Sequence, residues 1–220
     1  MSERVKAAEF KKAIQAFCHD HGCDQRYASF DYCYQYFHSF KPHQRKTMAD
    51  AIHLQESCLQ LAFYLASWGM FRGSSFLLQR SSRHFQPLVE WLSTCDRRLW
   101  TIDIDQYSEP DVEMLLQAAT DIRTALGGDK RPSDTLVTKI MLGVFGNTPA
   151  FDQFVKKAFG IHSFCRKNLL KLGDVYKANR RAVDSISVHC YDFSTGTQTG
   201  LPYTKAKIID MYGFITGQQQ

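Results

Sequence analysis

The segment that decides the fold is "TLVTKIMLGVFGNTPAFDQFVKKAF" (residues 135–159). Its first half repeats apolar residues at helical spacing and carries one lysine, Lys139. Gly-Asn-Thr-Pro (146–149) then predicts a rigid turn, because proline fixes its own backbone and glycine allows the chain to reverse. A second helix is expected over about 150–159, with Asp152 in its first turn, where the helix dipole favours a negative charge.

Helical spacing of apolar residues dominates the rest of the chain as well. Ser108 is a candidate cap for the helix that starts at Glu109, and Ser133 or Asp134 for the one that starts near Thr135. Further helices are expected over 5–22, 43–70, 76–94 (bent near Pro87), 109–126, 162–181 and 202–215, and a flexible surface loop over 191–202. The prediction is an all-α fold of about eight to nine helices. It would form one compact domain or two lobes, 1–24 with 130–220 against 25–129.

Composition and length predict a folded domain with a sizeable core. The chain has 220 residues, of which 44% are hydrophobic and 13% aromatic, and this excludes intrinsic disorder. The start, "MSERVKAAEF", lacks the apolar stretch of a signal peptide, so the seven cysteines are expected to be reduced thiols. The longest apolar stretch, residues 59–71, has the length of a buried helix and not of a membrane span. We therefore expect a cytoplasmic protein with no membrane association.

The charges are distributed unevenly along the chain. The formal net charge is +5. Residues 103–113 contain acids and no Lys or Arg, whereas residues 156–181 contain eight basic residues and one acid, Asp174. The basic residues would steer a polyanion to the end of the molecule that follows Asp152. A solvated basic helix face is the competing explanation.

Two further clusters invite a chemical interpretation, and both are set aside. The segment "CHDHGCDQRYASFDYC" (18–33) has residue types that suit zinc, but its spacing does not match a pair of ligand knuckles. His189 and Cys190 are adjacent in sequence and would not face each other, so they do not predict a catalytic pair. No nucleotide-binding fingerprint is present. The sequence therefore predicts no metal site and no cofactor.

The segment 125–159 resembles the catalytic segment of the helix–hairpin–helix DNA glycosylase superfamily. Members of that superfamily often show a helix, a short turn containing proline, and a Pro-X-Asp or Pro-X-X-Asp step whose aspartate opens the next helix. The stretch "TPAFDQFV" (148–155) is similar, and Asp152 falls on this aspartate. Some divergent members carry a lysine in the preceding helix at about the place of Lys139. The resemblance implies an all-α, DNA-glycosylase-like fold.

The sequence departs from the family in three respects. The family hairpin normally reads like Leu-Pro-Gly-Val-Gly, whereas the corresponding segment here is "LGGDKRPSD" (126–134). The lysine that forms a Schiff base in bifunctional members has no clear match. The four-cysteine cluster signature of some members is absent. The resemblance therefore implies a monofunctional enzyme.

A monofunctional DNA glycosylase would remove a modified base by water attack and leave an abasic site. Asp152 would stabilise the cationic sugar and orient the water, and Lys139 would contact Asp152 or the nucleic acid. The base, flipped out of double-stranded DNA, would enter a pocket formed by Tyr64, Trp68 and Arg72. The residues expected to bind the DNA backbone are Asn147, Lys156, Lys157, Arg166, Lys167 and Lys171.

The residues do not identify the base that the enzyme would remove. The Gly/Ser-rich break near Arg72 and the unusual hairpin favour a bulky base, such as the glucosylated hydroxymethylcytosine of some phages, and an antiviral role. Structural roles compete at each position: a helix-terminal aspartate for Asp152, a surface lysine for Lys139, core packing for Tyr64 and Trp68. The alternative function is a non-enzymatic helical protein that binds nucleic acid or a protein partner through the basic helix at 162–181.

Overall fold

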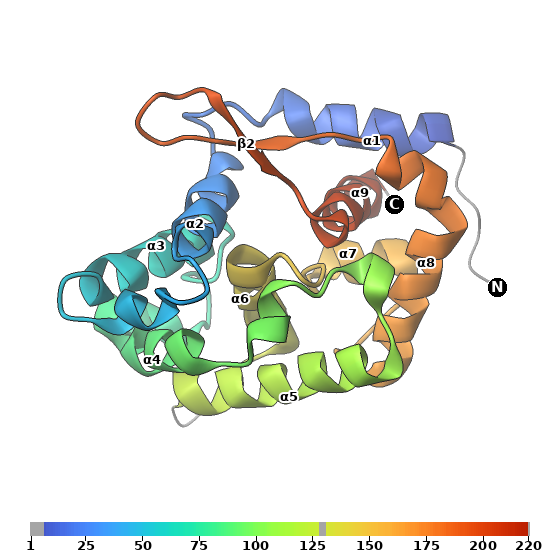
Figure 1. Cartoon of the computed structure of the whole chain (residues 1–220). Helices are drawn as coiled ribbons and strands as arrows, with labels where there is room; N and C mark the ends of the chain where they lie inside the picture. The colour runs from blue at the N-terminus through green and yellow to red at the C-terminus, as the bar shows by residue number, and fades with distance from the viewer. Residues whose placement is uncertain (1–6, 128–130, 220) are drawn as a thin grey trace.

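A computed structural model describes residues 7–127 and 131–219, and this part of the chain is mostly helical (Figure 1). The all-α prediction is confirmed there, with nine α-helices: α1 (Ala7–His19), α2 (Ala28–Ser39), α3 (Leu54–Ser67), α4 (Gln86–Thr94), α5 (Glu109–Leu126), α6 (Asp134–Phe145), α7 (Gln153–Phe159), α8 (Arg166–Asp184) and α9 (Lys205–Gln219). Five short 3₁₀ helices join them: η1 (Arg45–Ala49), η2 (Phe76–Gln79), η3 (Ser82–Phe85), η4 (Arg97–Trp100) and η5 (Ile104–Gln106).

The ends of α5 and α6 follow from local capping. The Ser108 hydroxyl accepts from the N–H of Asp111, and the Asp111 carboxylate accepts from the N–H of Ser108, which completes a capping box. The Ser133 hydroxyl accepts from the N–H of Leu136 in the same way at the start of α6. Gly146 ends α6 in the left-handed conformation, with φ +66°. The predicted cap at Ser108, and Ser133 as one of the two candidates before α6, are confirmed.

Three segments differ from their sequence predictions. Helix α2 is not predicted, and the expected helix over 43–70 is divided into η1 and α3. The expected loop over 191–202 contains an antiparallel hairpin of β1 (His189–Tyr191) and β2 (Gln198–Pro202). Pro87 lies in the first turn of α4 and not at a bend inside a longer helix.

Helix α6 occupies the middle of the molecule (Figure 1). Every residue from Leu136 to Phe145 is buried, against α2, α3 and α5. Gly143 on this helix permits close contact with α3, because a Cβ atom at Gly143 would lie 2.3 Å from the ring of Tyr64. The central position of α6 explains why its sequence is apolar on nearly every face.

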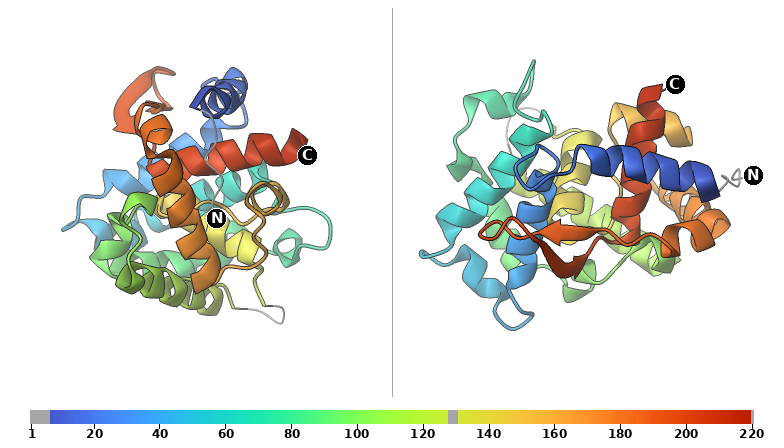
Figure 2. Two further views of the ribbon diagram at one scale, coloured as in Figure 1. Left: turned by 90° about the vertical axis from the view of Figure 1, so that its right-hand side faces the viewer. Right: turned by 90° about the horizontal axis from the view of Figure 1, so that it is seen from above.

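The last helix, α9, packs on α7 and on α1. A Cβ atom at Gly217 would lie 2.1 Å from the carbonyl oxygen of Phe154, so the two helix backbones approach closely at this glycine. On another side, Tyr212 stacks on Phe10 of α1 with ring centroids 4.1 Å apart, and Figure 2 shows α1 crossing over α9. The first and last described helices are therefore packed together.

A buried polar cluster holds the hairpin on α2. The Asp31 carboxylate accepts from the Tyr203 hydroxyl and, at 2.9 Å, from the N–H of Tyr191. The Nε2 atom of His21 lies 2.7 Å from Asp31 Oδ2. The Gln35 side chain donates to the carbonyl of Tyr191 at 2.5 Å. These contacts fix the base of the hairpin, and its tip extends beyond them.

The buried apolar residues form one continuous cluster that includes both of the segments proposed as separate lobes. The division into two lobes stays a prediction. Residues 128–130, in the segment where the family hairpin would fall, lie outside the described residues. Within the part of the chain that the structure describes, no helix has the length and hydropathy required to cross a bilayer.

Candidate functional site

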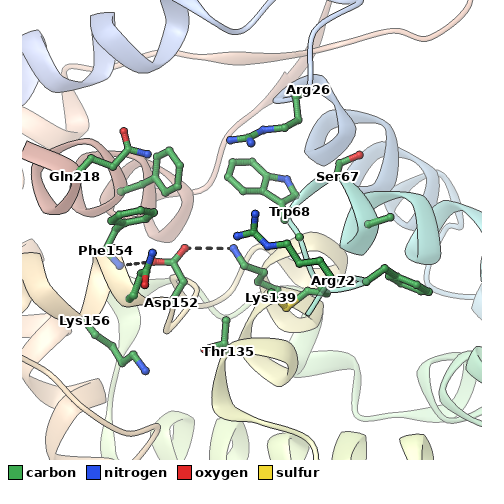
Figure 3. Close-up of a pocket in the computed structure, with 16 residues that line it drawn as sticks. Arg26, Ser67, Trp68, Arg72, Thr135, Lys139, Asp152, Phe154, Lys156 and Gln218 are labelled. Atoms are coloured by element: carbon green, nitrogen blue, oxygen red, sulfur yellow. Dashed lines mark hydrogen bonds and ion pairs between the residues drawn. The ribbon is translucent and has the colours of Figure 1, made fainter. Parts of the chain in front are cut away.

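A cavity of about 680 Å³ opens where the end of α3, α6, the start of α7 and α9 meet (Figure 3). It is lined by Arg26, Trp68, Gly69, Arg72, Thr135, Lys139, Asp152, Phe154, Lys156, Phe214 and Gln218, among others. Four of the residues predicted from the sequence for the catalytic pair and the base pocket meet here: Asp152, Lys139, Trp68 and Arg72. The volume lies in the range of small-molecule binding sites.

Asp152 is the N-cap residue of α7, one position before the first helical residue. Its Oδ1 atom accepts from the N–H groups of Phe154 and Val155, each at 3.0 Å. Its Oδ2 atom lies 3.3 Å from the Nζ atom of Lys139. The side chain is 13% exposed, so the carboxylate is fixed by protein contacts and still borders the cavity. Capping therefore explains one of its two oxygens, and the ion pair involves the other.

The backbone before Asp152 is held by side chains from two helices. The Thr138 hydroxyl accepts from the N–H of Phe151 at 2.7 Å, and the Thr135 hydroxyl donates to the carbonyl of Phe151 at 2.8 Å. On the other side, Asp210 of α9 accepts from the N–H of Ala150 at 2.9 Å. Because these contacts add to the proline-locked turn, the position of Asp152 is set by α6, α7 and α9 together.

Asp210 is itself part of a buried ion pair. Its Oδ2 atom lies 2.9 Å from the Nζ atom of Lys207, and both side chains are buried. The Lys207 ammonium also lies 4.6 Å from the ring centroid of Phe30 and 5.2 Å from that of Trp68. A buried cation needs such partners, because an unpaired one carries a large desolvation cost. Through Asp210 the pair contacts the turn that carries Asp152, and through Lys207 it contacts Trp68, which lines the cavity.

Lys139 is a buried lysine, with a side chain 5% exposed. Asp152 is its ion-pair partner, and its Nζ atom lies 4.8 Å from the ring centroid of Trp68 (Figure 3). The interpretation of Lys139 as a surface lysine is wrong, since α6 is central and this face of the helix borders the cavity. The ammonium is within reach of any ligand that contacts Asp152.

Trp68 is the C-cap residue of α3, and it lines the cavity. The ring stacks on Tyr27 with centroids 5.3 Å apart, and the indole Nε1 has no hydrogen-bond partner in the described structure. Arg72 lies across Gly69: a Cβ atom at Gly69 would meet the Arg72 Nε atom at 2.7 Å. Gly69 also has φ +77°, which disfavours other residues. Glycine at this position thus allows Arg72 to line the cavity.

Two of the predicted site residues are buried in the protein away from the cavity. Tyr64 is a core residue that packs on Gly143, although helical spacing places it on the same face as Trp68. Helix α3 ends at Ser67, so Trp68 lies beyond the helix and lines the cavity, whereas Tyr64 does not. Asn147 is fully buried. Its Nδ2 atom donates to the carbonyl of Leu99 at 3.1 Å, so it stabilises the turn and is not available to a DNA backbone. Both predictions are corrected.

Among the remaining predicted DNA-binding residues, Lys156 lines the cavity and the others lie elsewhere. Lys157 and Lys167 are exposed. The guanidinium of Arg166 pairs with Glu109 at 2.6 Å, and Lys171 donates to the carbonyl of Gly160 at 3.0 Å. Contact of these residues with a nucleic acid stays a prediction.

Arg26 is a cavity residue that the sequence patterns did not single out. It comes from the connection between α1 and α2, and its guanidinium lies 5.1 Å from the ring centroid of Tyr27 and 5.4 Å from that of Trp68. No local pattern distinguishes it, because its neighbours in the cavity come from distant segments. In the described part of the chain, Arg26, Arg72 and Lys156 form no ion pair with an acid.

The cavity is therefore electropositive, with one carboxylate. Four cations border it (Arg26, Arg72, Lys139 and Lys156), and Asp152 is the acid among them. The described residues contain no group of three His, Cys, Asp or Glu side chains that could hold a metal ion. The arrangement suits an anionic ligand that brings one electron-poor centre close to Asp152. Comparison of the chain with known protein families, with curated proteins and with solved structures finds no match.

Proposed function

We propose that the protein is a monofunctional DNA glycosylase that excises a modified base. The observation that carries the proposal is the fixed carboxylate of Asp152 at the edge of a cavity bordered by unpaired cations. Breaking an N-glycosidic bond makes the sugar cationic, and a carboxylate that needs no reorganisation stabilises that charge. The surrounding cations suit the phosphates on either side of the flipped nucleotide.

In the proposed reaction, the C1′–N bond breaks and its electron pair leaves with the base. Water attacks C1′, and Asp152 Oδ2 takes the proton that the water loses. The proton then passes to the released base, so the products are a neutral base and an abasic sugar with a hydroxyl at C1′. The Lys139 ammonium, 3.3 Å from Asp152 Oδ2, would orient the carboxylate and contact the nearest phosphate.

The cavity supports a bulky rather than a compact base. Its volume of about 680 Å³ exceeds what a flat, unsubstituted base requires, and the Arg26 and Arg72 side chains that line it could donate to a polar substituent. A glucosylated hydroxymethylcytosine of phage DNA, and hence an antiviral role, is the substrate that we propose to test first.

The deciding experiment measures abasic-site formation. The protein is incubated with phage and bacterial DNAs that carry different base modifications, and the aldehyde of each abasic site is counted with a hydroxylamine probe. The Asp152→Asn variant is the main comparison, because asparagine caps a helix as well as aspartate and should leave α7 intact. We expect it to bind DNA and to form at least about 100-fold fewer abasic sites.

A matched control is Asp96→Asn. Asp96 also caps a short helix, by accepting from the N–H of Arg98 at 2.8 Å, but it does not line the cavity. Its activity should equal that of the wild type. Undiminished activity of Asp152→Asn would remove Asp152 from the mechanism. DNA binding without abasic sites on any substrate would favour the alternative, a non-enzymatic nucleic-acid-binding protein.

The alternative has weaker support from the basic helix α8. Three of its cations form ion pairs with acids: Arg166 with Glu109, Lys177 with Asp174, and Arg180 with Asp184. These pairs reduce the charge that α8 offers to a polyanion. Of the cavity cations, Lys139 pairs with Asp152, whereas Arg26, Arg72 and Lys156 form no such pair in the described structure.

A further inference from the structure

A second cavity, of about 500 Å³, adjoins the first. Arg26 and Ser67, both labelled in Figure 3, line both cavities, so the two meet at these residues. The second cavity is formed by the start of α2, one face of α3 and the tip of the β1–β2 hairpin. A ligand that occupies the first cavity therefore lies next to the second, on the other side of Arg26.

The walls of this second cavity include aromatic rings that are open to solvent. Phe63 of α3 is 67% exposed, and Phe193 at the hairpin tip is 79% exposed. Phe193 packs edge-on against Tyr32 of α2, with ring centroids 5.1 Å apart. Leu59 extends the same apolar surface by one turn of α3. Grouped and exposed side chains of this kind mark a binding surface more often than single exposed ones.

A buried hydroxyl group inside the second cavity lacks a partner. Ser29 is 4% exposed, and its Oγ atom makes no hydrogen bond in the described structure. A buried polar group without a partner is costly, and a ligand atom that bonds to the Ser29 hydroxyl would remove that cost. Asp24, Gln25 and Gln60 add polar groups to the same cavity. The ligand should therefore be flat and apolar on its faces and polar at its edge.

We propose that the second cavity binds an unpaired nucleobase adjacent to the target nucleotide, an inference that rests on the proposed function. The base stacks on Phe63, its edge bonds with the Ser29 hydroxyl, and Arg26 contacts the phosphate between the two nucleotides. Stacking of a base on an aromatic side chain is tolerant of sequence, because every base has a π face. A protein segment fits less well, since the cavity is small and contains the orphan hydroxyl.

This arrangement has a consequence for the form of the DNA. A flanking base that occupies the second cavity has left its own stack, as the target base has. The protein should therefore bind a single strand or a locally opened duplex more tightly than a continuous duplex, because the unstacking is already complete. The preference should be independent of any modification on the target base.

The test is binding of an unmodified single-stranded oligonucleotide of about 12 thymidines, followed by fluorescence anisotropy. We expect Phe63→Ala to weaken binding about 10-fold and Ser29→Ala a few-fold. Ile52→Ala is the matched control, because Ile52 is a large exposed apolar residue outside both cavities, and its affinity should be unchanged. Circular dichroism of each variant confirms that the helices are intact.

The failures of the two proposals are distinguishable. Unchanged oligonucleotide affinity in Phe63→Ala, with normal abasic-site formation, overturns the second base site and leaves the glycosylase proposal standing. Phe63-dependent binding without abasic sites on any DNA supports the base site and overturns the glycosylase. If sedimentation shows that Phe63→Ala abolishes a dimer while oligonucleotide affinity is unchanged, the surface is a protein interface and the base site is overturned.

Discussion

Replacing Gly217 of α9 by alanine should force α9 away from α7. The new Cβ atom would lie 2.1 Å from the carbonyl oxygen of Phe154 and 2.6 Å from its carbonyl carbon. Both atoms belong to the backbone, so no side-chain rotation relieves the contact. Since real Cβ contacts are not shorter than 3.0 Å, the helices must separate by at least the difference, about 0.9 Å.

The sign of the stability change shows whether the close contact with α7 outweighs the gain in helix propensity. Overpacking of this kind costs about 1–3 kcal/mol, whereas alanine in place of glycine gains at most about 1 kcal/mol from helix propensity. We therefore expect Gly217→Ala to lower the free energy of unfolding by about 1–2 kcal/mol. Gly173→Ala in α8 is the control, because its Cβ atom would meet Tyr107 at an ordinary 3.5 Å. That variant should be as stable as the wild type or more stable.

Urea unfolding followed by circular dichroism measures both variants. Because α7 begins directly after Asp152, the same displacement of about 1 Å should also lower abasic-site formation about 100-fold in Gly217→Ala. A Gly217→Ala protein that unfolds at higher urea than the wild type would refute the close approach of α7 and α9. A destabilised variant with full activity would refute the dependence of Asp152 on that approach.

Two further predictions concern ionisable groups. Lys139→Met should cost about 1–3 kcal/mol of stability, since Asp152 loses its cation but keeps two N–H bonds, and combining it with Asp152→Asn should cost less than the sum. If the two substitutions shift the urea midpoint additively, the energetic coupling between Lys139 and Asp152 is contradicted. Burial and the nearby Arg45 lower the pKa of His38 from 6.5 to about 4. Below pH 6.5 the unfolded chain therefore binds a proton that the folded protein excludes, and stability should fall by up to about 3 kcal/mol towards pH 4. His38→Gln should flatten that slope, and parallel curves for both proteins would contradict it.

Sequence patterns predicted those parts of the fold that local chemistry decides. The caps at Ser108 and Ser133 depend on residues within one turn, so they are readable in a single sequence. Helix α2 was missed because "ASFDYCYQYFHS" (28–39) is aromatic on several faces and holds few strong helix formers. The segment 191–202 is predicted as a loop although it belongs to the β1–β2 hairpin, since Ser, Thr and Gly dominate its turn and its position is fixed by Asp31, far away in the chain.

In the candidate site too, contacts within one segment can be predicted from the sequence, and contacts between distant segments cannot. The contact between Asp152 and Lys139 was predictable because one rigid turn joins their two helices. Tyr64 was misplaced because helical spacing groups residues on a face without telling which way that face points. Arg26 and Lys207 escaped notice since they meet Trp68 only through tertiary packing.

The packing of α1 on α9 has a consequence for how the molecule folds. Phe10 and Tyr212 stack although nearly the whole chain separates them, and the lining of the first cavity runs from Arg26 to Gln218. Contacts between such distant residues require a long loop to close, which costs conformational entropy. A chain in which α9 is undocked has no assembled cavity, because Phe214 and Gln218 of α9 line it, so ligand binding should report the docking of α9.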